Sequence, residues 1–275
     1  MQNTQIRQAI DPRHAKSMDT EELRSEFLIE RLFEPGCTHF VYSHLDRLIV
    51  GGTMPGSTTV TIDKIAETGT ANWLDRREAT IVNIGSGQGQ VKVGGESHTL
   101  SHHDMLYLGM GAGPVELSGD TKFYILSAPA HRSIPTRLIT IDQAAQVPLG
   151  TRETSNERTI YQFVHPDVME SCQLVIGITK LASGSVWNTM PAHLHDRRSE
   201  AYLYLDVPDD QRVFHFMGQA DETRHLIVSN EQAILSPGWS IHCGAGTSSY
   251  SFLWCMAGDN VDYTDVEMVG MSDLR

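Results

Sequence analysis

The sequence predicts an all-β protein that consists of two copies of one β-barrel, with a short helix near the N-terminus. Short runs rich in Val, Ile, Thr and aromatic residues alternate with Gly, Pro, Asn and Asp along most of the chain, as in sandwiches and barrels. Three stretches of the first half recur in the same order in the second half, which indicates an internal duplication. With 275 residues, 40% of them hydrophobic, such a chain can bury a proper core.

The predicted helix covers residues 19–33. Leu23 and Phe27 recur there at helical spacing. Asp19 can cap the first turn, and Glu22 follows three residues later, which is the pattern of a capping box. We expect this segment to be the one long helix of the protein.

The internal repeat shows where the two halves differ in length. Asp196 follows Asp75 by 121 residues, whereas Leu235 follows Leu100 by 135, so the second half carries about 14 extra residues between these matches. The extra residues include the stretch MGQADETRH. The three pairs of matching stretches are 48–53 with 174–179, 71–79 with 192–201, and 100–113 with 235–246.

The boundary between the two copies should fall in residues 141–159, a proline-containing stretch with few strand-forming residues. We therefore predict a first domain at residues 1–150, which holds the helix and one barrel, and a second barrel at residues 151–275.

Composition excludes several classes of function. A net charge of −13 repels nucleic acid and anionic membranes, and no stretch approaches the roughly 18 apolar residues that cross a membrane. The four cysteines show no CxxC spacing and the first residues lack the apolar core of a signal peptide, so a reduced, cytoplasmic protein is expected. Because the same charge repels an anionic substrate, we expect an arginine near any site that binds one.

A group of histidines in the second half has the spacing of metal ligands. Residues two apart in a strand point to the same side, so His193 and His195 can both face one ion. Glu200 follows after a turn, where the next strand can bring it alongside, and His242 follows a Pro-Gly turn further on. Three imidazoles and a carboxylate suit zinc, and also iron, manganese or nickel.

The first half offers a comparison for this group, since an HxH pair alone is more often two surface histidines. In the repeat alignment Asn72, Leu74 and Tyr107 stand where the second half has its three histidines, while the DRR tripeptide persists. Joint replacement is what a shared role predicts, so we expect a metal in the second half only. Since the metal-free copy keeps its DRR, we interpret Arg197 and Arg198 as structural residues that form salt bridges at the turn.

HxHx4E, followed by a Pro-Gly turn and a lone histidine, resembles the two metal motifs of the cupin superfamily, whose fold is a double-stranded β-helix or jelly roll. Longer blocks, among them FYILSAPAH, WNTMPAHLHDRRSEAY, FHFMGQADETRH and NEQAILSPGWSIHCGAGT, resemble the 5-dehydro-4-deoxy-D-glucuronate isomerases, also called 4-deoxy-L-threo-5-hexosulose-uronate ketol-isomerases. The resemblance runs over nearly the whole chain. It implies two cupin barrels, of which the first is degenerate and metal-free.

The resemblance also implies a function. It implies an aldose–ketose isomerase that converts 5-dehydro-4-deoxy-D-glucuronate to 3-deoxy-D-glycero-2,5-hexodiulosonate in the breakdown of pectin-derived uronates, and a homohexamer. Carried onto this sequence, it implies one Zn²⁺ per chain, bound by His193, His195, Glu200 and His242, the same four residues that the spacing indicates.

Such a reaction needs a base, a Lewis acid for the enediolate, and a cation for the substrate carboxylate. Tyr202 shares a strand face with Glu200 and is one candidate for the base; Glu222 and His225, in the extra residues of the second half, are others. For the carboxylate we select Arg224, because its bidentate fork suits that group and the metal-free copy lacks it.

Three alternatives stay open at this stage. The chain could be the 5-deoxyglucuronate isomerase of inositol catabolism, which has the same chemistry. It could be a cupin dioxygenase that uses iron, or a metal-stabilised binding protein without turnover.

Overall fold

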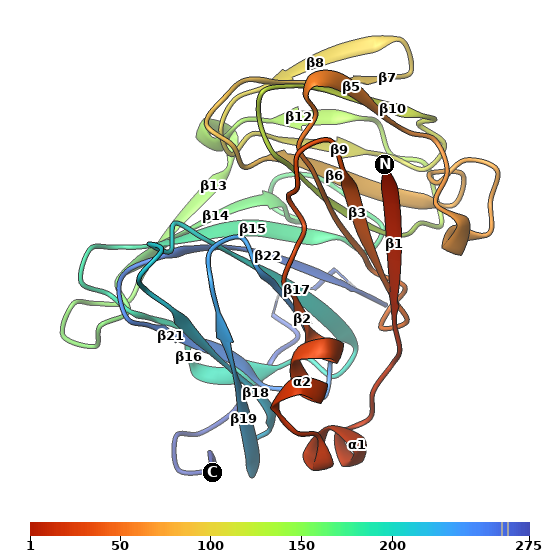
Figure 1. Ribbon diagram of the computed structural model, residues 1–275. Coiled ribbons are helices and arrows are strands. Elements are labelled where there is room, and N and C mark those ends of the chain that lie inside the picture. The colour runs from red at the N-terminus through yellow and green to blue at the C-terminus, as the bar shows by residue number, and fades with distance from the viewer. Residues whose placement is uncertain (260, 263) are drawn as a thin grey trace. The chain divides into compact units, whose positions relative to one another are not determined.

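The computed structural model describes residues 1–259, 261–262 and 264–275. Their regular secondary structure is almost all β-strand, and two short α-helices are the only α-helices among the described residues; Figure 1 shows how the strands are arranged. The predicted all-β class is confirmed. Two compact units are present: residues 1–7, 31–144 and 163–174 form unit 1, and residues 8–30, 145–162 and 175–275 form unit 2. No helix in the described part of the chain is long and apolar enough to cross a membrane.

Unit 1 is a barrel of two sheets. The larger sheet has the order β1-β3-β4-β11-β6-β9-β12 and the smaller the order β5-β10-β7-β8. Apolar side chains from both sheets, such as Ile81, Val91 and Ile125, meet between them and exclude water. The strands are β1 Gln2–Arg7, β3 Thr38–Ser43, β4 Ile49–Thr53, β5 Gly56–Ile62, β6 Arg77–Asn83, β7 Gly89–Val93, β8 Glu96–Leu100, β9 Met105–Leu108, β10 Val115–Gly119, β11 Phe123–Pro129 and β12 Arg137–Ile139.

Unit 2 repeats this topology. Its larger sheet has the order β13-β14-β15-β22-β17-β20-β2 and its smaller sheet the order β19-β18-β21-β16-β23. The strands are β2 Leu28–Ile29, β13 Ala145–Leu149, β14 Arg158–Val164, β15 Val175–Leu181, β16 Trp187–Leu194, β17 Arg198–Leu205, β18 Val213–Gln219, β19 Glu222–Val228, β20 Ala233–Ser236, β21 His242–Gly246, β22 Ser251–Gly258 and β23 Glu267–Met268. The same strand order in both units confirms the predicted duplication of a jelly-roll barrel.

The predicted helix is shorter than expected. Helix α2 covers Thr20–Phe27 and begins with the expected capping box, in which Asp19 accepts from the N–H of Glu22. It ends at Phe27 because Leu28–Ile29 form strand β2, which pairs with β20. A second helix, α1 at Pro12–Ser17, was not expected; Asp11 caps it. Burial of Leu28 in the sheet outweighs its helical spacing.

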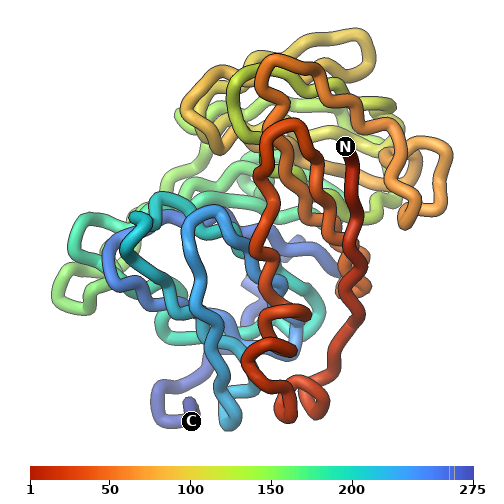
Figure 2. Tube along the Cα trace, viewed as in Figure 1, coloured from red at the N-terminus to blue at the C-terminus, as the bar shows by residue number. Residues whose placement is uncertain are grey.

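The division between the units differs from a single boundary at residue 150. Residues 8–30, with both helices, belong to unit 2, and residues 163–174 belong to unit 1. The helices stay with unit 2 because Phe27 is buried in its core, edge-on to Trp239, and β2 extends its larger sheet. In Figure 2 the trace of residues 8–30 lies beside the strands of this unit.

The third predicted match between the halves is wrong by one strand. Leu100 of the first LS dipeptide ends β8, whereas Leu235 and Ser236 of the second end β20, so identical dipeptides mark different strands. Tyr107 lies on β9, which holds the place of β20, whereas His242 lies on β21 in the smaller sheet.

Of the other two predicted replacements, Asn72 is partly buried and Leu74 is buried in the apolar core of unit 1. The sequence comparison named no counterpart of Glu200; Ala79, 121 residues before it, lies on β6 where unit 2 has β17.

Candidate metal centre

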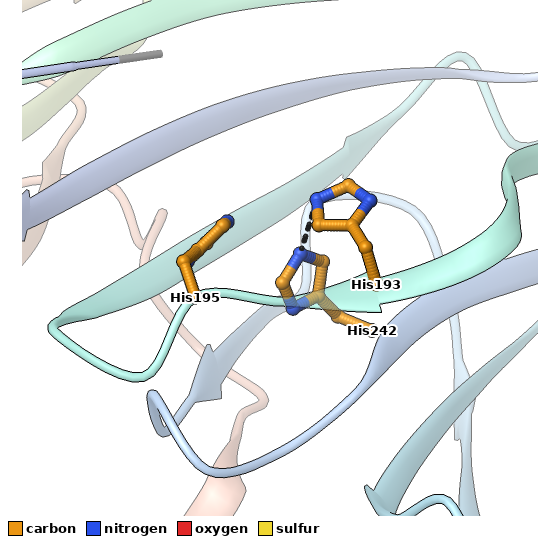
Figure 3. A group of neighbouring side chains, drawn as sticks. All are labelled: His193, His195 and His242. Carbon is orange, nitrogen blue, oxygen red and sulfur yellow. Dashed lines mark hydrogen bonds between the residues drawn. The ribbon is translucent and has the colours of Figure 1, made fainter. Parts of the chain in front are cut away.

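The three histidines of the predicted site converge inside unit 2, as Figure 3 shows. His193 on β16 and His242 on β21 are opposite each other in the register of the two strands, and their Nε2 atoms are 3.1 Å apart. His195 lies just beyond the end of β16, in the turn toward β17. The sequence prediction that HxH would present both imidazoles to one point agrees with this placement.

Glu200 reaches the same point from the larger sheet. It lies on β17, and its Oε2 is 3.3 Å from Nε2 of His195 and 3.2 Å from Nε2 of His242. His195, Glu200 and His242 are each less than 5% exposed. The predicted ligands from strands far apart in sequence therefore meet between the two sheets of one barrel.

The spacing of these donor atoms fits a transition metal. Zinc–nitrogen and zinc–oxygen bonds of about 2.0–2.1 Å give a tetrahedron whose edges are about 3.3–3.4 Å. The three separations of 3.1–3.3 Å are close to such edges. Neutral nitrogen donors with one carboxylate suit zinc, iron, manganese and nickel alike. The residues present thus form a possible metal site without rearrangement of the backbone.

The electrostatics of the histidines favour the unprotonated state that a metal requires. Burial lowers the pKa of His193 to about 4, although Glu200 opposes the shift. Burial, and then the neighbouring imidazoles, lowers the pKa of His242 well below its ordinary value. At neutral pH both rings are therefore neutral and keep a lone pair for coordination.

In the buried rings of His195 and His242, the second nitrogen, Nδ1, also has a partner. Nδ1 of His195 lies 3.3 Å from the carbonyl oxygen of Arg198, and a carbonyl only accepts, so Nδ1 carries the proton and Nε2 is left for a metal. Nδ1 of His242 lies 3.4 Å from Oγ of Ser236. These contacts fix the orientation of the two rings.

A cavity of about 270 Å³ opens onto the site. His193, His195 and Glu200 form one part of its wall, and Tyr202 lies beside them, with its ring centroid 5.5 Å from that of His242. The remaining wall is largely apolar, so a bound molecule would lose most of its water. The apolar and hydroxyl-bearing residues of this wall are Leu149, Ile160, Thr179, Thr189, Met190, Pro191, Phe252, Trp254, Met256, Val266 and Met268.

Comparison with known proteins then places the chain in a family. The model of the KduI/IolB family matches residues 28–269. The chain belongs to the KduI/IolB family. Within that family it is 57% identical, over all 275 residues of both chains, to 4-deoxy-L-threo-5-hexosulose-uronate ketol-isomerase from Cereibacter sphaeroides. The proteins of the same name from Rhizobium meliloti and Shouchella clausii are 54% and 49% identical, with at least 98% of each chain covered.

Solved structures agree on the fold of this KduI/IolB member. An IolB-like protein from Salmonella typhimurium has a TM-score of 0.68 at 17% identity, covering 81% of this chain and 87% of its own. Oxalate decarboxylase from Bacillus subtilis has a TM-score of 0.56 at 9% identity, covering 81% and 71%. These matches confirm the predicted cupin-type fold.

The structure does not bring Arg224 to the cavity, so its selection for the substrate carboxylate is not supported. Its guanidinium donates to the carbonyl oxygens of Lys16, at 2.9 Å, in the last turn of α1, and of Met18, at 2.6 Å, which caps the end of that helix. Arginine commonly binds unpaired carbonyls at the end of a helix. The prediction that DETRH lies in an insertion is also wrong, because it followed from the mistaken match of Leu100 with Leu235. These residues belong to the β18–β19 hairpin, whose counterpart in unit 1 is β7–β8, and α1 packs against β18.

Two candidates for the base also lie outside the cavity wall. Glu222 forms an ion pair of 3.1 Å with Lys16, and His225 is exposed on β19. Tyr202 does line the cavity, as predicted. Tyr204, two residues on, is buried instead against His215, whose Nδ1 is 2.7 Å from the phenol oxygen.

The DRR arginines are structural, as interpreted from the repeat. Arg197 pairs with Asp259 at 3.3 Å and Asp265 at 3.9 Å, and buried Arg198 donates to the carbonyl oxygen of Asp265. They hold the turn that positions His195 and Glu200.

Arg158 is a cavity residue that the sequence reasoning missed. It lies in the stretch 141–159 that we had assigned to a boundary, although RTIYQFV alternates like a strand and forms β14. A second group of donor side chains, Glu34, Cys37 and His39, lies partly exposed in unit 1, where Glu34 and His39 pair at 3.0 Å. All four cysteines of the chain are free thiols.

Proposed function

We propose that this chain is a metal-dependent ketol-isomerase that converts 5-dehydro-4-deoxy-D-glucuronate to 3-deoxy-D-glycero-2,5-hexodiulosonate in the degradation of pectin-derived uronates. Full-length relatives at 49–57% identity that bear the ketol-isomerase name support this activity. The observation that carries it is the convergence of three imidazoles and a carboxylate, of which His193, His195 and Glu200 line a cavity large enough for a six-carbon sugar acid.

His193, His195, Glu200 and His242 would hold one Zn²⁺ per chain; iron, manganese and nickel suit the same donors. When bound, the metal ion supplies a Lewis acid that polarises the substrate carbonyl and stabilises the negative charge that develops on its oxygen. Support for one ion per chain comes from unit 1, where apolar Leu74 and Ala79 lie in the positions of two of these ligands.

The chain's own residues must exclude water and allow two protons to move. The reaction transfers a proton from the hydroxyl-bearing carbon to the neighbouring aldehyde carbon, and the proton of that hydroxyl passes to the former aldehyde oxygen. Tyr202 lies in the cavity wall beside the donor cluster, so we assign it the carbon-bound proton, which it takes up and returns. Phe252, Trp254 and Met256 keep solvent from the reacting carbons.

The family resemblance supports a homohexamer in the cytoplasm, and four free cysteines agree with a reducing compartment. Light scattering of the purified protein tests the hexamer. A mass other than six chains would contradict it.

Product formation tests the function. Metal-loaded protein is mixed with the deoxy-keto-uronate and followed by NMR, before and after removal of metal by a chelator. We expect turnover that is lost with the metal and restored by Zn²⁺, and much slower solvent deuterium incorporation in Tyr202→Phe at unchanged metal content. No turnover by the loaded protein, or equal rates with and without metal, would overturn the proposal.

One alternative is favoured by a specific observation. The family includes IolB-like proteins, and one of them has the same fold with a TM-score of 0.68. 5-Deoxyglucuronate in the same NMR assay separates the two isomerases, because the better substrate has the higher kcat/KM. A cupin dioxygenase would instead consume oxygen, which an oxygen electrode detects.

A further inference from the structure

We propose that Arg158 binds the substrate carboxylate and holds the sugar acid across the cavity, with its reacting end at the metal site. This inference rests on the proposed function, since it concerns the substrate of the same cavity. It replaces the sequence assignment of Arg224, and neither the family match nor the likeness to solved structures assigns it.

The first reason is charge. The chain carries a net charge of −13, so an anion that enters a largely apolar cavity loses its hydration within a repulsive field. A buried carboxylate needs a cationic partner with good hydrogen-bond geometry. Among the described residues that line the cavity, Arg158 alone carries a permanent positive charge. The two histidines of the wall, His193 and His195, are assigned to the metal in the proposed function.

The second reason is position. In the larger sheet the order β14-β15-β22-β17 places Arg158 three strands away from Glu200. Three strand spacings of about 4.8 Å offset the two strands by roughly 14 Å. Arg158 is also displaced along the sheet, because its neighbour Glu157 accepts from the N–H of Ala182, near the end of β22 that pairs with Leu205 rather than with Glu200. Two long side chains, one from each end, leave room between them for an open six-carbon chain. The aldehyde and the carboxylate of the proposed substrate are at opposite ends of such a chain.

The third reason is what lies between the two ends. Arg158 and Ile160, two residues apart on β14, both line the cavity, so this face of the strand points inward. Thr179 on β15 and Trp254 on β22 continue the wall, and Nε1 of Trp254 donates to Oγ1 of Thr179 at 3.1 Å. Gly177 leaves space for the indole, because a Cβ there would lie 2.2 Å from a ring carbon of Trp254.

The loop before β14 orients the guanidinium. Nη1 of Arg158 donates to the carbonyl oxygen of Asn156 at 2.9 Å. The Asn156 side chain in turn accepts from the N–H of Thr151, and Gly150, at φ +79°, approaches Asn156 so closely that a Cβ would overlap its carbonyl oxygen. A guanidinium held in this way keeps its planar fork in a fixed orientation, which favours a carboxylate over a point-like anion.

The test compares a charged substrate with a neutral one. Metal-loaded Arg158→Gln and Arg158→Lys are assayed with the deoxy-keto-uronate and with its C6 amide, which keeps the reacting end but has no charge. Loss of a charge-assisted contact should raise KM for the uronate by roughly 30- to 100-fold in Arg158→Gln, with less than about 3-fold change for the amide. Arg158→Lys should lie between, because it keeps the charge and loses the fork.

Two control variants use cations of the same unit outside the cavity wall. Arg224→Lys should leave both KM values unchanged, since Arg224 binds carbonyls beside α1. Lys180 lines a separate pocket of about 550 Å³ that Arg158 also borders, and Lys180→Met should likewise leave KM unchanged. A rise in KM for Lys180→Met without one for Arg158→Gln would overturn the proposal, because the carboxylate would then lie in that pocket.

The same experiment distinguishes failure of this inference from failure of the proposed function. If the wild type shows no turnover of the uronate, the function fails. If the wild type turns over normally and Arg158→Gln keeps its KM and its preference for uronate over amide, Arg158 does not bind the carboxylate. Metal content and thermal midpoint of each variant show that the comparison is made on folded, loaded protein.

Discussion

His242 is the proposed ligand most distant in sequence from the HxH pair, and its replacement tests whether the metal takes part in the chemistry. His242→Ala removes one of four donors, so we expect lower metal content and a kcat reduced by at least about 100-fold. Metal analysis and kinetics on the same samples check this. His225→Ala is the matched control, since this histidine is exposed on β19. A His242→Ala variant without metal but with near-normal kcat would contradict Lewis-acid chemistry.

His215 gives a prediction on pH and stability. It is fully buried, and burial lowers its pKa to about 3, whereas an unfolded histidine titrates near its ordinary value of 6.5. As pH falls from about 6.5 toward 3, the unfolded chain gains a proton that the folded chain does not, so the free energy of unfolding decreases. The slope from this residue is about 1.4 kcal/mol per pH unit.

Urea unfolding of the metal-free protein between pH 7 and pH 5 measures this slope. His215→Gln should reduce the dependence on pH, and His225→Gln, an exposed position, should not. Equal slopes in wild type and His215→Gln would show that His215 is protonated in the folded state.

At the scale of the element, the capping box of α2 is a local test of fold stability. The side chain of Asp19 accepts from the N–H of Glu22 at 2.9 Å, and the Glu22 side chain accepts from the N–H of Asp19 at the same distance. Asp19→Ala should lower the free energy of unfolding by about 1 kcal/mol. Glu21→Ala, exposed in the same turn, should change it by less than about 0.5 kcal/mol. Denaturant unfolding curves decide between these outcomes.

Elements whose pattern is local could be predicted from the sequence, and so could most of the site. The HxH pair, the turn before Glu200 and the Pro-Gly turn before His242 follow from strand period and turn chemistry. The length of α2 could not be predicted, because Leu28 is helical by spacing but pairs with β20, over 200 residues away.

The role predicted for the DETRH stretch is not supported, for a related reason. Nothing in the sequence shows that Arg224 meets carbonyls beside a helix, or that Arg158 faces the cavity. Both facts depend on which strands become neighbours. The alignment of Tyr107 with His242 failed because short identical letters outweighed strand order.

At the scale of the whole molecule, the division into two units raises the question whether residues 151–275 can fold and bind a metal on their own. Residues 151–275 alone lack α1, α2, β2 and β13, all of which belong to unit 2. Without Phe27 and Leu28 the core of this unit is open to water, so we expect the fragment to aggregate and to bind no metal stoichiometrically. Co-expression with residues 1–150 should restore a folded, metal-loaded complex.

Circular dichroism and metal analysis of the purified fragment measure the outcome. A monomeric fragment 151–275 that unfolds cooperatively and retains one metal would show that the N-terminal segments are dispensable.

The exchange of segments between the units also has an evolutionary consequence. Recombination can separate the two halves of a duplicated gene only if one cut in the sequence leaves every segment of each barrel on the same side. Here residues 8–30 complete unit 2 and residues 163–174 complete unit 1, so no single crossover separates them intact. We therefore expect the barrel with the proposed metal site and the other barrel to be inherited together, since a descendant with only one of them has to rebuild its core.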